Sequence, residues 1–241
     1  DVPEPEMGIN DVMIHVDRTG ICGTDLHIFQ WDAWAQKTIP VPMVIGHEAA
    51  GTVAAVGPGV TGLVPGDDVV LVYLPQCGHC VRCRRGEAWL CDVGVAANNL
   101  GELLTGGTRL TLDGEPIHHH MGVAAFSEYT LVAEASAVKV PPGLAAADTC
   151  IFGCAVLCGA GTALNTAGVS DGDSVAVVGL GAVGLSAILG AKVAGARRIV
   201  AIDRLETKLA AAMSLGATDV VALTHQRFLH ELNVAAIKAS G

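Results

Sequence analysis

A glycine-rich turn between two apolar segments is the feature that most constrains the fold of this chain. Residues 174–178 predict a buried strand, and residues 182–194 predict the helix that follows it. The turn carries a Gly-x-Gly-x-x-Gly pattern, in the order Gly179, Leu180, Gly181, Ala182, Val183 and Gly184. In this pattern the first glycine allows a tight turn, the second lets a ligand approach the backbone, and the third lets the helix pack on the strand. The N-terminus of the helix would then face a bound phosphate.

The residues around this turn continue as alternating strands and helices, which predicts βαβ units and a parallel sheet. We expect a helical linker at 148–167, strands at 198–202 and 219–222, and helices at 205–215 and 225–239. Asp203 follows the strand at 198–202, and its carboxylate suits a ribose 2′-hydroxyl and would repel a 2′-phosphate. This favours NAD over NADP. Arg204 is the opposing signal, because an arginine can hold a 2′-phosphate.

The first part of the chain predicts a mostly antiparallel β region. Short apolar runs alternate with Gly and Pro turns, and strands are expected at 12–16, 41–45, 51–56, 69–73, 127–132 and 137–140. Residues 93–122 are rich in Gly, Asn and Thr and predict a loop.

The charge balance excludes two classes of partner. The chain has 24 acidic and 14 basic residues and a net charge of −10, which disfavours a nucleic-acid or anionic membrane surface. Charge-free windows at 149–170 and 174–191 are long enough to cross a bilayer, but glycines and polar residues interrupt them, so we expect both in the protein core. No signal segment opens the sequence, and the cytoplasm is the expected compartment.

A cluster of cysteines predicts a structural metal site. Its spacing is Cys-x2-Cys-x2-Cys-x7-Cys, formed by Cys77, Cys80, Cys83 and Cys91. A closed set of four thiolates is typical of structural zinc, and such clustering favours metal chemistry in a reducing compartment over disulfides. An iron–sulfur cluster is the alternative, but its usual run places the fourth cysteine after three residues and before a proline.

Two further motifs lie in the β region, Cys22-Gly-Thr-Asp-Leu-His27 and Gly46-His-Glu-Ala-Ala-Gly51, and Gly153-Cys154 follows much later. Together with the cysteine cluster and the glycine turn, in this order, they resemble the zinc-dependent medium-chain alcohol dehydrogenases over almost the whole chain. The resemblance implies an α/β protein with a β-rich domain. A GroES-like catalytic zinc domain is expected at residues 1–155, with the structural zinc lobe at 77–91. A partial Rossmann domain, a doubly wound parallel sheet that binds NAD, is expected at residues 156–241.

The resemblance also implies a catalytic zinc besides the structural one. The residues that match its ligands are Cys22, His47 and Cys154, with Glu48 beside the metal and able to exchange onto it. Three protein ligands and an open position are what Lewis-acid zinc requires. Asp25 would hold the second ring nitrogen of His47.

The resemblance implies that Thr24 takes the proton of an alcohol substrate and that His27 passes it to solvent, while hydride goes to NAD. Lys208 matches a lysine that contacts the adenosine ribose. Cys158 stands where the family usually has a threonine near the nicotinamide. The adjacent histidines 118–120 precede a Phe-Ser-Glu-Tyr strand (residues 126–129) that also matches the family, and we leave them out of the zinc ligands.

The sequence leaves several alternatives open. Residues 31–48 resemble L-threonine 3-dehydrogenase, whereas residues 93–165 resemble enzymes acting on primary or aryl alcohols, so a general alcohol ranks before threonine. A zinc- and nucleotide-binding protein without turnover is the alternative of another class.

The sequence pattern also predicts that these 241 residues are part of a longer enzyme. A full sheet of this type has six strands in two halves, and only the first half is recognisable here, with the 174–178 strand at an exposed edge. The family's opening hairpin is also absent before Asp1. The resemblance implies a homo-oligomer at full length, and the missing half of the sheet predicts little or no dehydrogenase turnover from these residues alone.

Overall fold

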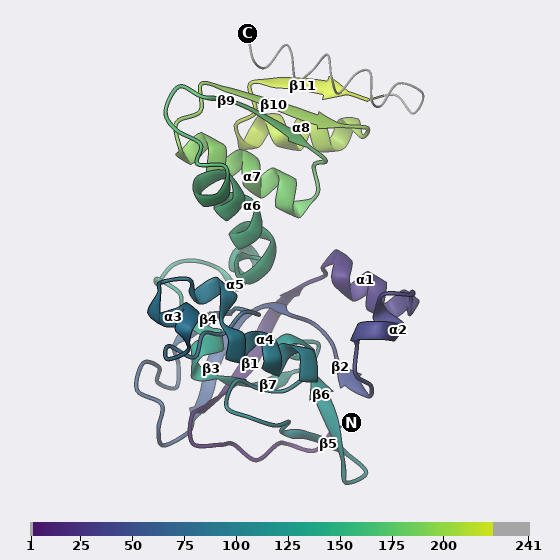
Figure 1. Ribbon diagram of the computed structural model, residues 1–241, viewed down its shortest axis with the longest axis vertical. Helices are drawn as coiled ribbons and strands as arrows, with labels where there is room; N and C mark the ends of the chain where they lie inside the picture. The colour runs from purple at the N-terminus through teal and green to yellow at the C-terminus, as the bar shows by residue number, and fades with distance from the viewer. Residues whose placement is uncertain (1, 224–241) are drawn as a thin grey trace. The chain divides into compact units, whose positions relative to one another are not determined.

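The computed structural model describes residues 2–223 of the chain. It groups the chain into two compact units, Asp1–Cys154 and Ala155–Gly241 (Figure 1). Each unit has a hydrophobic core of its own, formed in the first by residues such as Val12 and Leu71 and in the second by residues such as Ile188 and Ile199.

An antiparallel sheet forms the centre of the first unit. Its strand order is β7-β1-β3-β4-β8, with bounds Tyr129–Ala133, Asp11–Gly20, Glu48–Val56, Asp68–Leu71 and Ala137–Lys139. Val12 and Ile14 alternate along β1 into the core and are fully buried, as the two-residue period of a strand requires. A smaller sheet has the order β2-β6-β5, with bounds Met43–Val44, Glu115–His119 and Leu110–Leu112.

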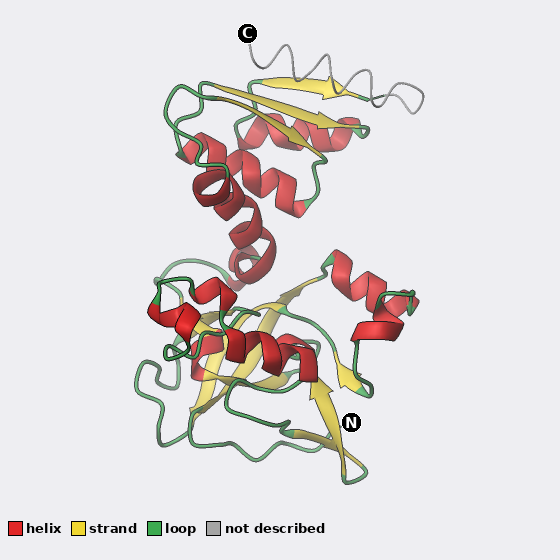
Figure 2. Ribbon diagram, viewed as in Figure 1, coloured by secondary structure: helices red, strands yellow, loops and turns green. Residues whose placement is uncertain are grey.

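Short helices join these strands (Figure 2). The α-helices are α1 (Gly23–Gln30), α2 (Ala35–Thr38), α3 (Val81–Arg84), α4 (Asp92–Leu100) and α5 (Ala146–Thr149), and the 3₁₀ turns are η1 (Ala88–Leu90), η2 (His120–Gly122) and η3 (Glu134–Ser136). A π-helical segment, η4 (Phe152–Val156), follows α5.

The expectation of a loop at residues 93–122 is wrong, because this segment contains α4, β5 and β6. Cys91 precedes α4 as its N-cap, and its Sγ accepts a hydrogen bond from the amide of Gly94 at 3.3 Å, so a thiol serves as the helix cap. Gly94 lowers helix propensity, but its position needs a glycine, because a Cβ there would lie 2.2 Å from the carbonyl oxygen of Pro75. Close packing therefore outweighs the local signal.

A three-stranded parallel sheet forms the second unit. Its order is β11-β10-β9, with bounds Asp219–Ala222, Arg198–Asp203 and Ser174–Val178. The helical segments are α6 (Leu157–Gly161), the π-helical η5 (Thr162–Thr166), α7 (Ala182–Val193) and α8 (Glu206–Leu215). Figure 2 shows α7 and α8 on one face of the sheet, and their apolar residues share one core with the strands. The helix expected at 225–239 lies outside the described residues.

The helical run Ala146–Thr166 is long and apolar enough to cross a membrane, by length and composition alone. Within it, Gly159 of α6 packs so closely on α7 that a Cβ would lie 2.1 Å from the carbonyl oxygen of Val183. Gly159 thus packs against a neighbouring helix of the second unit.

Candidate metal centre and nucleotide-binding turn

Four side chains of the first unit converge into one candidate metal site. The ligand atoms of Cys22, His47, Glu48 and Cys154 all lie within 4.8 Å of one another. Cys22 lies at the end of β1, as the N-cap of α1, and His47 and Glu48 lie at the start of β3. The pairing of β1 with β3 places Gly20 opposite Glu48 and so joins the two segments. Two thiolates, an imidazole and a carboxylate form a donor set that fits zinc.

Asp25 connects two of these ligands. Its Oδ2 accepts a hydrogen bond from the amide of Cys22 at 2.8 Å, and its Oδ1 lies 3.5 Å from Nδ1 of His47. Burial alone would raise the pKa of Asp25, but His47, the Cys22 amide and His120 outweigh it, so the pKa lies below its ordinary value. An ionised Asp25 can hold the Nδ1–H form of His47, which leaves Nε2 for a metal.

His120 lies on the other side of Asp25 and was not predicted from sequence. Its Nδ1 is 3.7 Å from Oδ1 of Asp25, and its ring contacts that of His47 edge-on at 5.0 Å between centroids. The side chain is 2% exposed, and neither ring nitrogen has a hydrogen-bond partner within the described residues. Burial, with the neighbouring His47, lowers its pKa to about 4.

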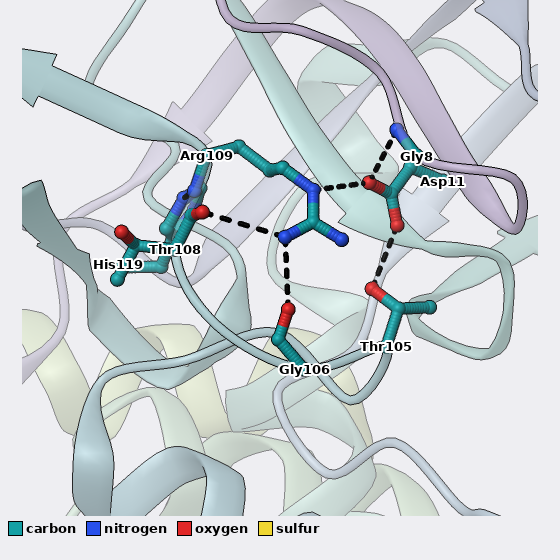
Figure 3. Close-up of polar contacts among 7 residues, drawn as sticks. All are labelled: Gly8, Asp11, Thr105, Gly106, Thr108, Arg109 and His119. Carbon is teal, nitrogen blue, oxygen red and sulfur yellow. Dashed lines mark hydrogen bonds and ion pairs between the residues drawn. The ribbon is translucent and has the colours of Figure 1, made fainter.

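The three adjacent histidines face three different surroundings and do not form one site. His119 accepts a hydrogen bond at Nε2 from the amide of Arg109, at 3.2 Å (Figure 3). His118 lies against Gly101. A Cβ added at Gly101 would lie 2.7 Å from the Cβ of His118. His120 faces Asp25, as described above.

Figure 3 also shows a buried ion pair that fixes the segment before β5 against the start of β1. The Asp11 carboxylate is fully buried and accepts hydrogen bonds from Nε of Arg109 at 2.8 Å, from the hydroxyl of Thr105 at 2.7 Å and from the amide of Gly8 at 2.9 Å. A buried carboxylate with three donors is well satisfied. We assign this cluster a structural role, because it anchors the segment that leads to His118, His119 and His120.

The residues expected to carry a proton lie on α1. The Sγ of Cys22 lies 3.7 Å from Oγ1 of Thr24, so Thr24 borders the metal cluster. His27 lies one turn further along the helix, and its side chain is 60% exposed. An exposed imidazole can exchange protons with solvent.

The cysteine lobe is arranged for a tetrahedral metal. The Sγ atoms of Cys77 and Cys83 are 4.0 Å apart, as are those of Cys80 and Cys91, and all four lie within 4.8 Å of one another. Zinc–sulfur bonds of ~2.3 Å would place tetrahedral sulfurs about 3.8 Å apart.

Backbone amides favour the thiolate at Cys80, whereas burial and the neighbouring thiols raise the pKa of Cys83 to about 12. The amide of Cys83 donates to Sγ of Cys80 at 3.4 Å, and hydrogen bonds of this kind lower the pKa of Cys80 to about 6. The amide of Cys80 in turn donates to Sγ of Cys77 at 3.3 Å. Thiolate is the form that binds zinc.

The glycine turn of the second unit has the geometry of a phosphate-binding turn. Gly179 has φ +87°, which favours glycine, and a Cβ at Gly184 would lie 2.0 Å from the carbonyl oxygen of Gly179. A Cβ at Gly181 would meet no atom within 4 Å, so the backbone there is open to a ligand. Ala182 and Val183 begin α7 directly after it.

Asp203 has backbone partners that the sequence did not reveal. Its Oδ2 accepts from the amide of Leu180 at 2.7 Å, and its Oδ1 accepts from the amides of Arg204 and Leu205. These hydrogen bonds hold the pKa of Asp203 below its ordinary value, and the one from the Leu180 amide has the largest effect. Nζ of Lys208 lies 4.0 Å from Oδ2. Asp203 therefore ties the glycine turn to the end of β10.

The fold agrees with the comparisons with known proteins. The family model of the alcohol dehydrogenase GroES-like domain matches residues 8–142, and that of the zinc-binding dehydrogenases matches residues 182–236. The chain belongs to the zinc-dependent medium-chain alcohol dehydrogenase family, as its motifs predicted.

Several relatives are similar over nearly the whole chain. An S-(hydroxymethyl)glutathione dehydrogenase from Escherichia coli O1:K1 / APEC is 43% identical over 221 residues, which are 92% of this chain and 58% of the relative. Benzyl alcohol dehydrogenase from Acinetobacter calcoaceticus superposes with a TM-score of 0.83 at 36% identity, over 100% of this chain and 63% of the other. An alcohol dehydrogenase zinc-binding domain protein from Burkholderia ambifaria gives 0.84 at 37% identity, over 97% and 62%. The chain thus spans less than two thirds of the length of these relatives.

Proposed function

We propose that this chain carries the zinc site and the NAD-binding turn of an oxidoreductase that transfers hydride from an alcohol to NAD. One observation carries the proposal: Cys22, His47, Glu48 and Cys154, from three separate segments, bring their ligand atoms within 4.8 Å of one another. Bound zinc would supply a Lewis acid that lowers the pKa of an alcohol, and NAD would supply the hydride acceptor.

The residues of the chain would divide the work as follows. Cys22, His47 and Cys154 hold the metal, and Glu48 lies beside it as a further ligand. Asp25 holds the ring of His47. Thr24 accepts the proton of the alcohol at its hydroxyl oxygen while its own hydroxyl proton passes on toward His27, which releases a proton to solvent. The place of Thr24 beside Cys22 and the exposure of His27 support these roles.

In the second unit, the turn Gly179–Gly184 would bind the pyrophosphate of NAD, and Asp203 and Lys208 would bind the adenosine ribose. The carboxylate of Asp203 favours NAD, since it would repel a 2′-phosphate. We further propose that Cys77, Cys80, Cys83 and Cys91 hold a structural zinc.

A primary alcohol is the substrate class that we propose. The names of two relatives, S-(hydroxymethyl)glutathione dehydrogenase and benzyl alcohol dehydrogenase, both denote a hydroxymethyl group, on sulfur in one and on an aryl ring in the other. L-threonine, a secondary alcohol, ranks behind it. We also propose a soluble, cytoplasmic protein that forms homo-oligomers at full length, with domains at about 1–155 and 156–241.

An alcohol panel tests this function. The full-length enzyme, of which we expect these residues to be a part, is loaded with zinc and mixed with NAD or NADP and with benzyl alcohol, S-(hydroxymethyl)glutathione, ethanol or L-threonine, while NADH or NADPH absorbance is followed. We expect NADH to form, and to form faster with the first two alcohols than with L-threonine. Zinc and NAD binding without any turnover would instead favour a binding protein.

A further inference from the structure

An exposed histidine on α1 is held by a carboxylate that lies beyond the helix. Nδ1 of His27 lies 2.6 Å from Oδ2 of Asp32, which is the length of a strong, charge-assisted hydrogen bond. The chain can make this contact because Trp31, the C-cap that follows α1, has φ 49° and turns the backbone back. The amide of Asp32 then reaches the carbonyl oxygen of His27 at 3.4 Å.

Asp32 is itself fixed in place by the segment that follows. Its other oxygen, Oδ1, accepts hydrogen bonds from the amides of Trp34 at 3.0 Å and Ala35 at 2.9 Å. The indole of Trp34 meets the ring of His27 edge-on, with 6.2 Å between centroids. The two oxygens of Asp32 therefore have different partners: Oδ1 accepts from amides at the start of α2, and Oδ2 contacts His27.

The hydrogen bonds around Asp32 keep it ionised. The hydrogen bond from the Ala35 amide has the largest effect and the hydrogen bond with His27 the next largest. Together they hold the pKa of Asp32 below its ordinary value. An ionised carboxylate only accepts hydrogen bonds, so the neutral His27 ring must carry its proton on Nδ1 to make this contact. Nε2 is then the unprotonated nitrogen of the ring.

We propose that Asp32 is a positioning residue, which fixes the tautomer of His27 so that Nε2 accepts the proton released from the alcohol. This inference rests on the proposed role of His27 in the first unit. The same division of labour, with a carboxylate on one imidazole nitrogen and proton transfer at the other, is the logic of hydrolase triads. Asp32 contributes through His27 and needs no contact with substrate.

Two variants and a matched control separate this role from a structural one. In Asp32→Asn, the amide oxygen can still accept from Trp34 and Ala35, but the amide nitrogen donates toward His27, so Nδ1 must become an acceptor. Asp32→Ala removes both functions. The control is Asp17→Asn, because Asp17 holds another exposed ring in the same way: Nδ1 of His15 lies 3.2 Å from Oδ1 of Asp17.

The direct readout is the tautomer of each ring, from long-range proton–nitrogen NMR correlations at mildly alkaline pH. His27→Gln and His15→Gln assign the two rings by loss of their signals. We expect mainly the Nδ1–H form of His27 in the unmodified chain, an inverted tautomer ratio in Asp32→Asn, and no change at His27 in Asp17→Asn. Asp32→Ala should release the ring to the mixture of tautomers found in free imidazole.

Two results would overturn the inference: an unmodified chain with mainly the Nε2–H form of His27, or the same tautomer ratio in Asp32→Asn as in the unmodified chain. The tautomer is read without zinc, NAD or turnover. Failure of the proposed dehydrogenase function would therefore leave this test intact, and a failed tautomer test would leave the metal site and the NAD turn standing.

Discussion

A Cβ atom at Gly184 would lie 2.0 Å from the carbonyl oxygen of Gly179, whereas a Cβ at Gly181 would meet nothing within 4 Å. The two glycines of the turn are therefore needed for different reasons. Gly184 lets α7 approach the turn, and Gly181 leaves the backbone open where we propose that a phosphate of NAD binds.

The pair Gly184→Ala and Gly181→Ala tests this difference. Gly184→Ala should destabilise the protein by roughly 1–3 kcal/mol, because overpacking at a close contact forces the backbone to move. Gly181→Ala should leave stability nearly unchanged and still weaken NAD binding, because its methyl group occupies the space of the ligand. Denaturant unfolding measures the first effect and NAD titration the second. Equal stability of the two variants would contradict the assignment.

The hydroxyl of Thr24 can be tested in the full-length enzyme by comparing Thr24→Val with Thr24→Ser. Valine keeps the shape but cannot accept a proton, so alcohol oxidation should fall by roughly 10²–10⁴-fold, the usual contribution of general acid–base catalysis. Serine keeps the hydroxyl and should retain most of the rate. Both should keep the zinc content of the unmodified chain. A Thr24→Val variant that oxidises alcohol as fast as Thr24→Ser would remove Thr24 from the proton path.

Because His119 is buried, we expect the free energy of unfolding to decrease in acid. Burial is the main cause that lowers the pKa of His119 from 6.5 to about 4, and the positive charge of Arg109 is the second cause. As the pH falls through this range, the unfolded chain binds a proton that the folded chain does not, so the free energy of unfolding decreases. The loss for one such group approaches ~3 kcal/mol when the pH has fallen to the folded-state value.

His119→Gln should flatten this part of the stability profile, because the amide oxygen can replace Nε2 as the acceptor for Arg109 and does not titrate. His15→Gln, at an exposed ring, is the control and should keep the slope of the unmodified chain. Unfolding free energies measured from pH 7 to pH 4 give the comparison. An unchanged slope in His119→Gln would show that other groups cause the acid sensitivity.

Local sequence patterns were enough to predict the strands, α7 and α8 in the described part of the second unit. β9 and β11 have the predicted bounds, and α7 and β10 differ from them by one residue. The ends of each of these strands and helices are marked within a few residues by a glycine, by a charged residue or by the end of the apolar repeat. α1 and α4 lack such signals: α4 begins at a cysteine cap, and its glycine is explained only by contact with Pro75.

The candidate sites depend on pairings that local patterns do not contain. The cysteine lobe could be predicted because its four ligands are close in sequence. Cys22, His47 and Cys154 meet through the pairing of β1 with β3 and the fold of η4, and only the family resemblance indicated them together. Nothing near Asp11 indicates its bond to Arg109, 98 positions away, and nothing near Asp25 indicates His120.

Zinc content tests the central claim most directly, because the claim is that one chain builds two independent metal sites. Elemental analysis of the chain loaded with zinc and freed of excess metal should give two zinc ions per chain. Cys154→Ser should give one, since the lobe keeps its ligands, and Cys150→Ala, a nearby cysteine outside both clusters, should give two. One zinc in the unmodified chain, or two in Cys154→Ser, would contradict the proposed catalytic site.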